Sequence, residues 1–149
     1  QETCLADLSA ALVETAATVC FDAIGGVKLG SYIMACMEQA ATKRMKEYSR
    51  YGSDTFKQLY IYGALDMSPT VLTRSFGFQW SVSGWLLTPF MTKAGPEIVG
   101  KMRARVVAEL TTTFASHYSH DVTLEQALDL ATMHAYNAKR TGEKYLIRP

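Results

Sequence analysis

The sequence predicts an all-α fold, a single compact bundle of five or six helices that opens with an antiparallel helical hairpin. Apolar residues recur at three- and four-residue steps over long stretches. Helix start and stop signals separate these stretches, and no strand has an obvious partner. At 149 residues the chain can bury one core, so we expect one domain over residues 1–149.

The first two predicted helices form the hairpin. One runs from about Thr3 to Ile24, and Gly25-Gly26 ends it with the positive φ that follows many helices. The other runs from about Ser31 to Tyr51 and stops at Gly52. Because the connection between them is short and contains glycine, we expect the two helices to be antiparallel.

The three cysteines can be paired on this hairpin. Cys20 and Cys36 lie about one turn on either side of the connection, so we predict a disulfide between them. Cys4 and Cys20 would be about 24 Å apart on one continuous helix. Two reduced, buried cysteines at the hairpin are the alternative to the disulfide. Cys4 is left over and could link two copies of the chain in a homodimer.

The middle of the chain is harder to interpret. Ser53-Asp54 and Ser68-Pro69 are both helix start signals. The uncharged run 75–92 carries apolar residues that alternate with small or polar ones, as in a half-buried strand: Phe76, Phe78, Trp80 and Val82. It also carries small residues at helical steps: Gly77, Ser81 and Gly84. We favour a close-packed helix, because a lone strand would have no partner.

Two later helices have clearer signals. Gly95-Pro96-Glu97 supplies a break, a first-turn Pro and a first-turn acid, and apolar residues follow at helical spacing. Thr123 and Gln126 form a capping-box pattern that opens the last helix, and Gly142 closes it. The tail 144–147 is apolar enough to dock on the rest of the chain.

Aromatic residues are dense in the second quarter of the sequence and just beyond it. They could line a pocket for an apolar ligand or form a patch for a protein partner. The alternative is that they fill the core of a small helical domain. The candidate ligand-binding or partner-binding residues are Tyr60, Tyr62, Phe76, Phe78, Trp80, Trp85 and Phe90.

The three histidines are the best candidates for chemistry. His117 and His120 are three residues apart at a predicted helix end, and His134 could complete a metal site with them and Asp121. The alternative is that the first two cap the helix end, where an imidazolium suits the helix dipole. No nucleophile elbow, phosphate-binding loop or haem-attachment motif is present in the sequence.

The end of the chain resembles a known family. It is similar to the end of a small periplasmic all-helical family of unknown function, whose pattern is an acid-capped helix, an aromatic residue and then G-x-K. The matching features within 118–146 are Thr123, Glu125, Tyr136 and Gly142-Glu143-Lys144. Arg140-Thr141 stands where that family has Ser-Pro. The resemblance implies export and helicity, and it implies no functional site.

Composition narrows the classes of function. The 15 Lys and Arg residues nearly balance the 14 Asp and Glu residues, which argues against nucleic acid as a partner. The run 75–92 is too short and too polar for a transmembrane span. An opening Gln1 without an initiator Met indicates a removed export signal, so we expect a secreted or periplasmic protein. A shortened chain is the alternative.

These observations predict a non-catalytic function. We expect an exported helical domain that binds another protein as an accessory, immunity-type or assembly factor, and we expect no cofactor. One alternative is a carrier of a small apolar ligand in the aromatic-lined pocket. The other is a metal-dependent enzyme at His117, His120 and His134.

Overall fold

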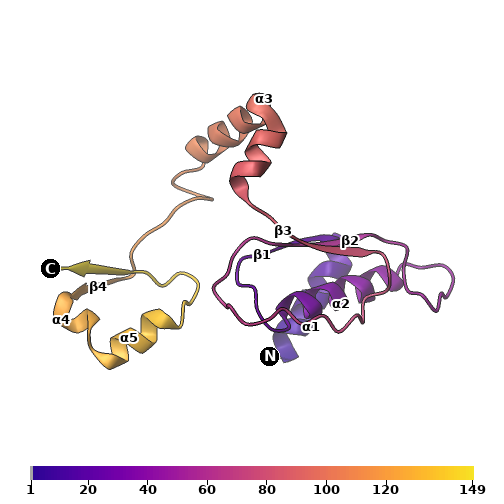
Figure 1. Cartoon of the computed structure of the whole chain (residues 1–149), viewed down its shortest axis with the longest axis horizontal. Helices are drawn as coiled ribbons and strands as arrows, with labels where there is room; N and C mark the ends of the chain where they lie inside the picture. The colour runs from indigo at the N-terminus through magenta and orange to yellow at the C-terminus, as the bar shows by residue number, and fades with distance from the viewer. Residues whose placement is uncertain (1) are drawn as a thin grey trace. The chain divides into compact units, whose positions relative to one another are not determined.

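The computed structural model describes residues 2–149 and the side chains from Leu5 onward, and its fold mixes helices with parallel strands (Figure 1). The chain forms two compact units, residues 1–93 and 94–149, which we describe separately. The all-α bundle predicted from the sequence is therefore wrong. The prediction of a single domain stays a prediction.

The first unit is built on a three-stranded parallel sheet. Its strands are β1 (Val19–Asp22), β2 (Lys57–Ile61) and β3 (Trp80–Gly84), which are neighbours in that order. In register, Leu59 at the centre of β2 stands between Cys20 and Val82. Since all three strands run the same way, their carboxyl ends meet at one edge of the sheet.

Two helices cover one face of this sheet. Helix α2 (Leu29–Thr42) packs against β2, and α1 (Glu2–Thr15) packs against α2 (Figure 1). Gly30 of α2 lies so close to the strand that a Cβ atom there would sit 2.5 Å from the Leu59 side chain. The buried core lies between helices and sheet, and it consists of Leu12, Met34, Cys36, Met37, Ala40, Leu59 and Phe76.

The predicted opening hairpin is wrong because α1 ends early. Ala16 takes a positive φ of 55°, which breaks the helix after Thr15. The β-branched and aromatic residues that follow form β1 instead of a further helical turn. Gly25 and Gly26 do have positive φ, as expected, but they turn the chain after a strand.

Two other predicted helices are strands or partly strands. The helix expected after Ser53-Asp54 is β2, and the first part of the run 75–92 contains β3. Strand β3 does have a sheet to join, because β1 and β2 lie in segments that the sequence predicts as helices. Helix α3 (Leu87–Ala108) then follows, with a kink at Gly95, where φ is 80° and ψ is 169°.

The predicted Cys20–Cys36 disulfide is absent, and both thiols are free. Cys20 lies in β1 and Cys36 lies in α2, so they belong to different layers rather than to one hairpin. The Cys36 sulfur instead accepts a hydrogen bond from the Ser9 hydroxyl at 3.3 Å. The side chain of Cys4 lies outside the described part, so the proposed homodimer link stays a prediction.

The second unit contains a small parallel pair of strands. Strand β4 (His120–Thr123) pairs with β5 (Tyr145–Arg148), and the helices α4 (Leu124–Ala127) and α5 (Leu130–Asn137) lie between them in sequence. The predicted capping box of Thr123 and Gln126 is confirmed, although α4 is only one turn long. None of the helices in residues 2–149 combines the length and hydropathy that a membrane span needs.

Candidate functional site

The turn after β1 is fixed by the last residue of the strand. Asp22 is buried, and its Oδ1 accepts hydrogen bonds from the amides of Ile24 and Gly25, both at 2.9 Å. A carboxylate that bonds two successive amides holds a tight Asx turn. The sequence therefore builds a rigid turn at the carboxyl end of β1.

The loop after β2 packs directly on this turn. The Asp22 carbonyl accepts from the amides of Tyr62 and Gly63 at 2.9 and 3.3 Å. A Cβ atom at Gly63 would lie 1.9 Å from the carbonyl oxygen of Ala23, so the two backbones can approach only because residue 63 is glycine. The amide of Asp66 further donates to the Ile24 carbonyl at 2.9 Å.

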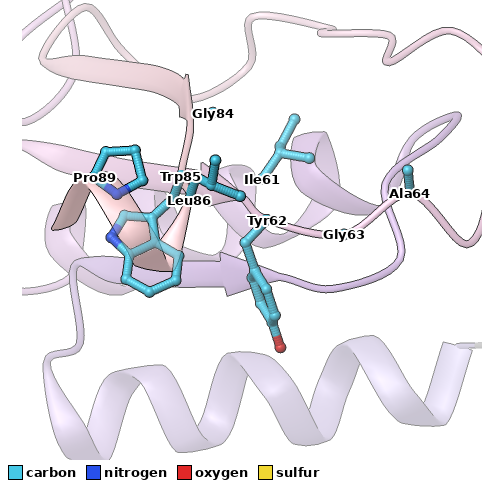
Figure 2. A pocket seen from close by; sticks show the side chains of 8 residues that line it. All are labelled: Ile61, Tyr62, Gly63, Ala64, Gly84, Trp85, Leu86 and Pro89. Carbon is cyan, nitrogen blue, oxygen red and sulfur yellow. The ribbon is translucent and has the colours of Figure 1, made fainter. Parts of the chain in front are cut away.

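A pocket of about 530 Å³ opens where β2 and β3 end (Figure 2). We call it the β2–β3 pocket. Trp85 continues the pairing beyond β3, because its amide donates to the Ile61 carbonyl at 2.9 Å. In Figure 2 the Trp85 ring lies beside Pro89, while Tyr62 and Ile61 point in opposite directions. The lining residues are Ile61, Tyr62, Gly63, Ala64, Gly84, Trp85, Leu86 and Pro89, and none of them is charged.

Aromatic side chains cluster at the same edge of the sheet. The Phe21 ring stacks on Tyr60 with 5.1 Å between ring centroids, and it meets Trp85 edge-on at 5.8 Å. Trp85 also lies 6.3 Å from Tyr62 and 5.4 Å from Phe90. Four of the seven aromatic residues predicted for binding thus lie together: Tyr60, Tyr62, Trp85 and Phe90.

The other three predicted aromatic residues lie elsewhere. Phe76 is fully buried in the core, and Trp80 packs on it edge-on at 5.0 Å. The indole nitrogen of Trp80 donates to the Gly77 carbonyl at 3.1 Å. Phe78 is 77% exposed, with Tyr51 as its aromatic neighbour. Phe76 thus lies in the core and Trp80 packs against it, as the alternative interpretation of the aromatic residues expects.

The three histidines are all exposed and do not form a cluster with other ligands. Among the residues that the structure describes, no group of three or more His, Cys, Asp and Glu side chains could hold a metal ion. His120 begins β4, and its ring stacks on Tyr145 with 4.4 Å between centroids. His117 precedes that strand, and His134 lies in α5.

Sequence reasoning missed seven residues of this edge: Phe21, Ile61, Gly63, Ala64, Gly84, Leu86 and Pro89. A signal for Gly63 and Gly84 was available, because each glycine ends a short run rich in β-branched or aromatic residues. That signal has meaning only once the runs are recognised as parallel strands, since glycines at strand ends let a ligand or a backbone approach closely.

Comparison with known proteins gives a likeness to a solved structure. No family model matches the chain, and no curated protein matches it. Among solved structures, the chain is similar to a "putative NADPH:quinone reductase" from Mesorhizobium loti, with 22% sequence identity and a TM-score of 0.54. The match covers 97% of this chain and 37% of that chain, so the present chain spans little more than a third of the reductase's length.

This likeness shows the fold and corrects the predicted function. The chain shares part of the neighbour's fold, and in this chain that fold mixes helices with parallel strands. The prediction of a helical protein-binding domain is wrong, because it depended on a helical bundle that the chain does not form. The predicted export stays a prediction. The two alternatives to that domain are not carried forward. The aromatic set of the ligand carrier is divided between the pocket edge and the core, and the described residues form no metal-ligand group at the histidines of the metal-dependent enzyme.

Proposed function

We propose that the chain forms part of a nicotinamide-dependent oxidoreductase, and that the β2–β3 pocket receives the ring end of the cofactor. The position of the pocket carries the proposal. In open α/β sheets, ligands bind outside the carboxyl ends of the parallel strands, and this pocket lies where β2 and β3 end. Its volume of about 530 Å³ is in the range of small-molecule sites.

The chemistry of the pocket fits a flat, uncharged ring. A Cβ atom added at Gly84 would meet nothing within 4 Å, so the backbone there is open to a ligand. Trp85 and Pro89 offer apolar surface for stacking, and Tyr62 adds a further aromatic side chain to the lining. A reduced nicotinamide ring is flat and carries no formal charge, so these side chains suit it.

The same residues do not fit the phosphate end of a dinucleotide. Phosphates are held by a G-x-G-x-x-G turn at a helix N-terminus. The turn after β1 has glycines at Gly25, Gly26 and Gly30, which is a different spacing. This chain therefore supplies the ring side of the proposed site, and the phosphates need groups from outside residues 1–149.

The residues of the chain would position the reacting partners. A bound nicotinamide supplies or accepts a hydride. Leu86 and Pro89 would cover one side of the ring with apolar surface. Gly63 would keep the loops after β1 and β2 close together, because its backbone lies against the Ala23 carbonyl. The reductase neighbour is named for a quinone substrate. A quinone is also a flat ring that could stack on Trp85.

Filling the pocket tests the proposal. The change is Gly84→Leu in the protein at its natural length, with Gly100→Leu as the matched control, because a Cβ atom at Gly100 also meets nothing within 4 Å. The chain has only two tryptophans. A Trp80→Phe background leaves Trp85 as the single tryptophan of residues 1–149. Fluorescence is followed during titration with NADPH, and the part of the signal that a further Trp85→Phe change removes is the signal of Trp85.

We expect saturable quenching of Trp85 in the parent and in Gly100→Leu, and at least about tenfold weaker binding in Gly84→Leu, about 1.4 kcal/mol. Circular dichroism of each variant shows whether the fold is kept. If Gly84→Leu folds and binds NADPH as tightly as the parent, the ring does not occupy this pocket.

A further inference from the structure

The outer edge of β1 has no partner strand within residues 2–149. The carbonyl groups of Thr18 and Asp22 accept hydrogen bonds from amides on the β2 side at 2.8 and 2.9 Å. Backbone groups alternate in direction along a strand, so those of Val19 and Phe21 point away from β2. An edge of this kind is a template for a further strand.

The sheet face beside this edge is also open. Helix α2 covers the face that carries Leu59, and no helix of the first unit packs along the opposite face (Figure 1). On that opposite face Val19 is 51% exposed and Phe21 is 52% exposed. Parallel sheets are almost always covered on both faces. The β1 edge therefore lacks a neighbouring strand, and the sheet face that carries Phe21, which we call the Phe21 face, lacks a covering helix.

If the sheet is part of the proposed cofactor-binding fold, the missing glycine fingerprint indicates which half of that fold it forms. A doubly wound sheet has the order 3-2-1-4-5-6, and the turn after its first strand carries G-x-G-x-x-G. Strands β1, β2 and β3 are adjacent in sequence order, as in either half. Because the turn at Gly25-Gly26 lacks the fingerprint, they correspond to strands 4, 5 and 6. In that order, strand 4 lies beside strand 1.

We infer that the β1 edge and the Phe21 face together bind an α/β polypeptide segment that leads from an added parallel strand into a G-x-G-x-x-G loop and a helix. Strand crossovers are right-handed. The segment winds away from β1 in the opposite direction to β2 and β3, so its helix must cover the face that α2 leaves open. One occupant then accounts for both the free edge and the exposed Phe21 ring.

Two observations support this occupant over a second copy of the chain. The reductase neighbour is far longer than this chain, which spans 37% of it, so the shared fold includes further polypeptide. Two copies related by a two-fold axis would have to pair their β1 strands antiparallel, and neither would add a phosphate-binding loop. The inference rests on the proposed function and extends it, because the segment would supply the loop that binds the phosphates of the cofactor.

Photo-crosslinking from the edge tests the inference. Val19 is replaced by the photoreactive p-benzoylphenylalanine in the protein made in its own cells, and cross-linked peptides are sequenced after irradiation. The matched control places the same group at Val107, which is 75% exposed in the second unit. We expect position 19 to link to a peptide in which an apolar run precedes G-x-G-x-x-G, and we expect position 107 not to link to that peptide.

A link from position 19 to a second copy of residues 1–149, or to a peptide without this loop, overturns the inference. Hydrogen exchange on the unmodified protein gives a second test that needs no substitution. The amides of Val19 and Phe21 should exchange as slowly as that of Cys20, which faces β2. Exchange at least about tenfold faster than at Cys20 shows an unpaired edge. Both tests can fail while NADPH still binds at the β2–β3 pocket. Equally, both can succeed while NADPH does not bind there, so the inference and the proposed function fail separately.

Discussion

The Nζ atom of Lys57 lies 2.5 Å from Oε2 of Glu38, with the lysine side chain wholly buried and the glutamate side chain 8% exposed. Ser53 donates to the same carboxylate twice, through its amide and its hydroxyl, both at 2.6 Å. Since Lys57 begins β2 and Glu38 lies in α2, this buried ion pair joins helix and strand at the end of β2 opposite the pocket.

Breaking the pair should destabilise the protein strongly. Lys57→Met leaves the Glu38 carboxylate buried without its counter-ion, which costs about 3–5 kcal/mol of unfolding free energy. Lys101→Met is the control, because Lys101 pairs with Glu97 on the surface and its loss costs about 1 kcal/mol or less. Urea unfolding measures both. A loss below about 1 kcal/mol in Lys57→Met would show that the pair contributes no more than a surface pair.

The same pair predicts a direction of pH dependence. Burial alone would raise the pKa of Glu38, but hydrogen bonds from Lys57 and Ser53 outweigh it and lower the pKa. A lowered folded-state pKa stabilises the protein above the unfolded value of about 4.3, and this stabilisation is lost as the pH falls through the folded-state pKa. Urea midpoints at falling pH should therefore drop more in the parent than in Glu38→Gln. Equal drops would contradict the assignment.

Replacement by alanine should lower the stability of the protein at Gly63 but not at Gly84. Gly63→Ala drives a Cβ atom into the Ala23 carbonyl, so we expect a loss of about 1–3 kcal/mol of stability and weaker NADPH binding. Gly84→Ala places its Cβ atom in open space, so the fold should keep its stability within about 1 kcal/mol. Thermal unfolding of both variants tests this, and equal stability would mean that the β1 and β2 turns are not in contact.

The thiols give a prediction about chemistry. Burial raises the pKa of the Cys20 thiol, and the charge of Asp22 raises it further. Because the thiolate is the reactive form, alkylation of Cys20 by iodoacetamide at mildly alkaline pH should be slower than that of glutathione. Mass spectrometry of the digested protein gives the rate for each site. A Cys20–Cys36 disulfide in the unreduced digest would contradict the layered arrangement of β1 and α2.

The capping box gives a local prediction in the second unit. The Thr123 hydroxyl accepts from the Gln126 amide at 3.2 Å, and the Gln126 side chain accepts from the Thr123 amide at 2.8 Å. Thr123→Ala should cost about 1 kcal/mol of stability. Thr141→Ala, at an exposed turn residue, is the control and should be neutral. Calorimetric unfolding distinguishes them, and identical curves would contradict the cap.

What the sequence could predict was local. The capping box at Thr123 and the positive φ of Gly25 and Gly26 depend on a few neighbouring residues, and both are present. The strands depend on partners far away in the chain: Cys20 stands beside Leu59, and Leu59 beside Val82. The spacing of apolar residues within a short window of sequence cannot reveal such pairings. Strands of four or five residues are therefore predicted as parts of helices.

The candidate site could not be predicted for the same reason. Tyr62 and Trp85 stood out as aromatic residues, but their meeting at one edge follows from the parallel register of β2 and β3. Helical periodicity places Phe21 in the last turn of the first predicted helix, whereas it joins that cluster from β1. Once a fold of alternating strands and helices is assumed, glycines at strand ends such as Gly63 become informative.

Nuclear Overhauser contacts between the nicotinamide ring and the protein test the central claim most directly. The protein at its natural length is prepared with labelled tryptophan and leucine, and NADPH is added. We predict contacts from the nicotinamide protons to the Trp85 indole and the Leu86 methyl groups, and none to Trp80, which packs on Phe76 in the core. Saturating NADPH without any contact to Trp85 or Leu86 would contradict the placement of the ring in the β2–β3 pocket.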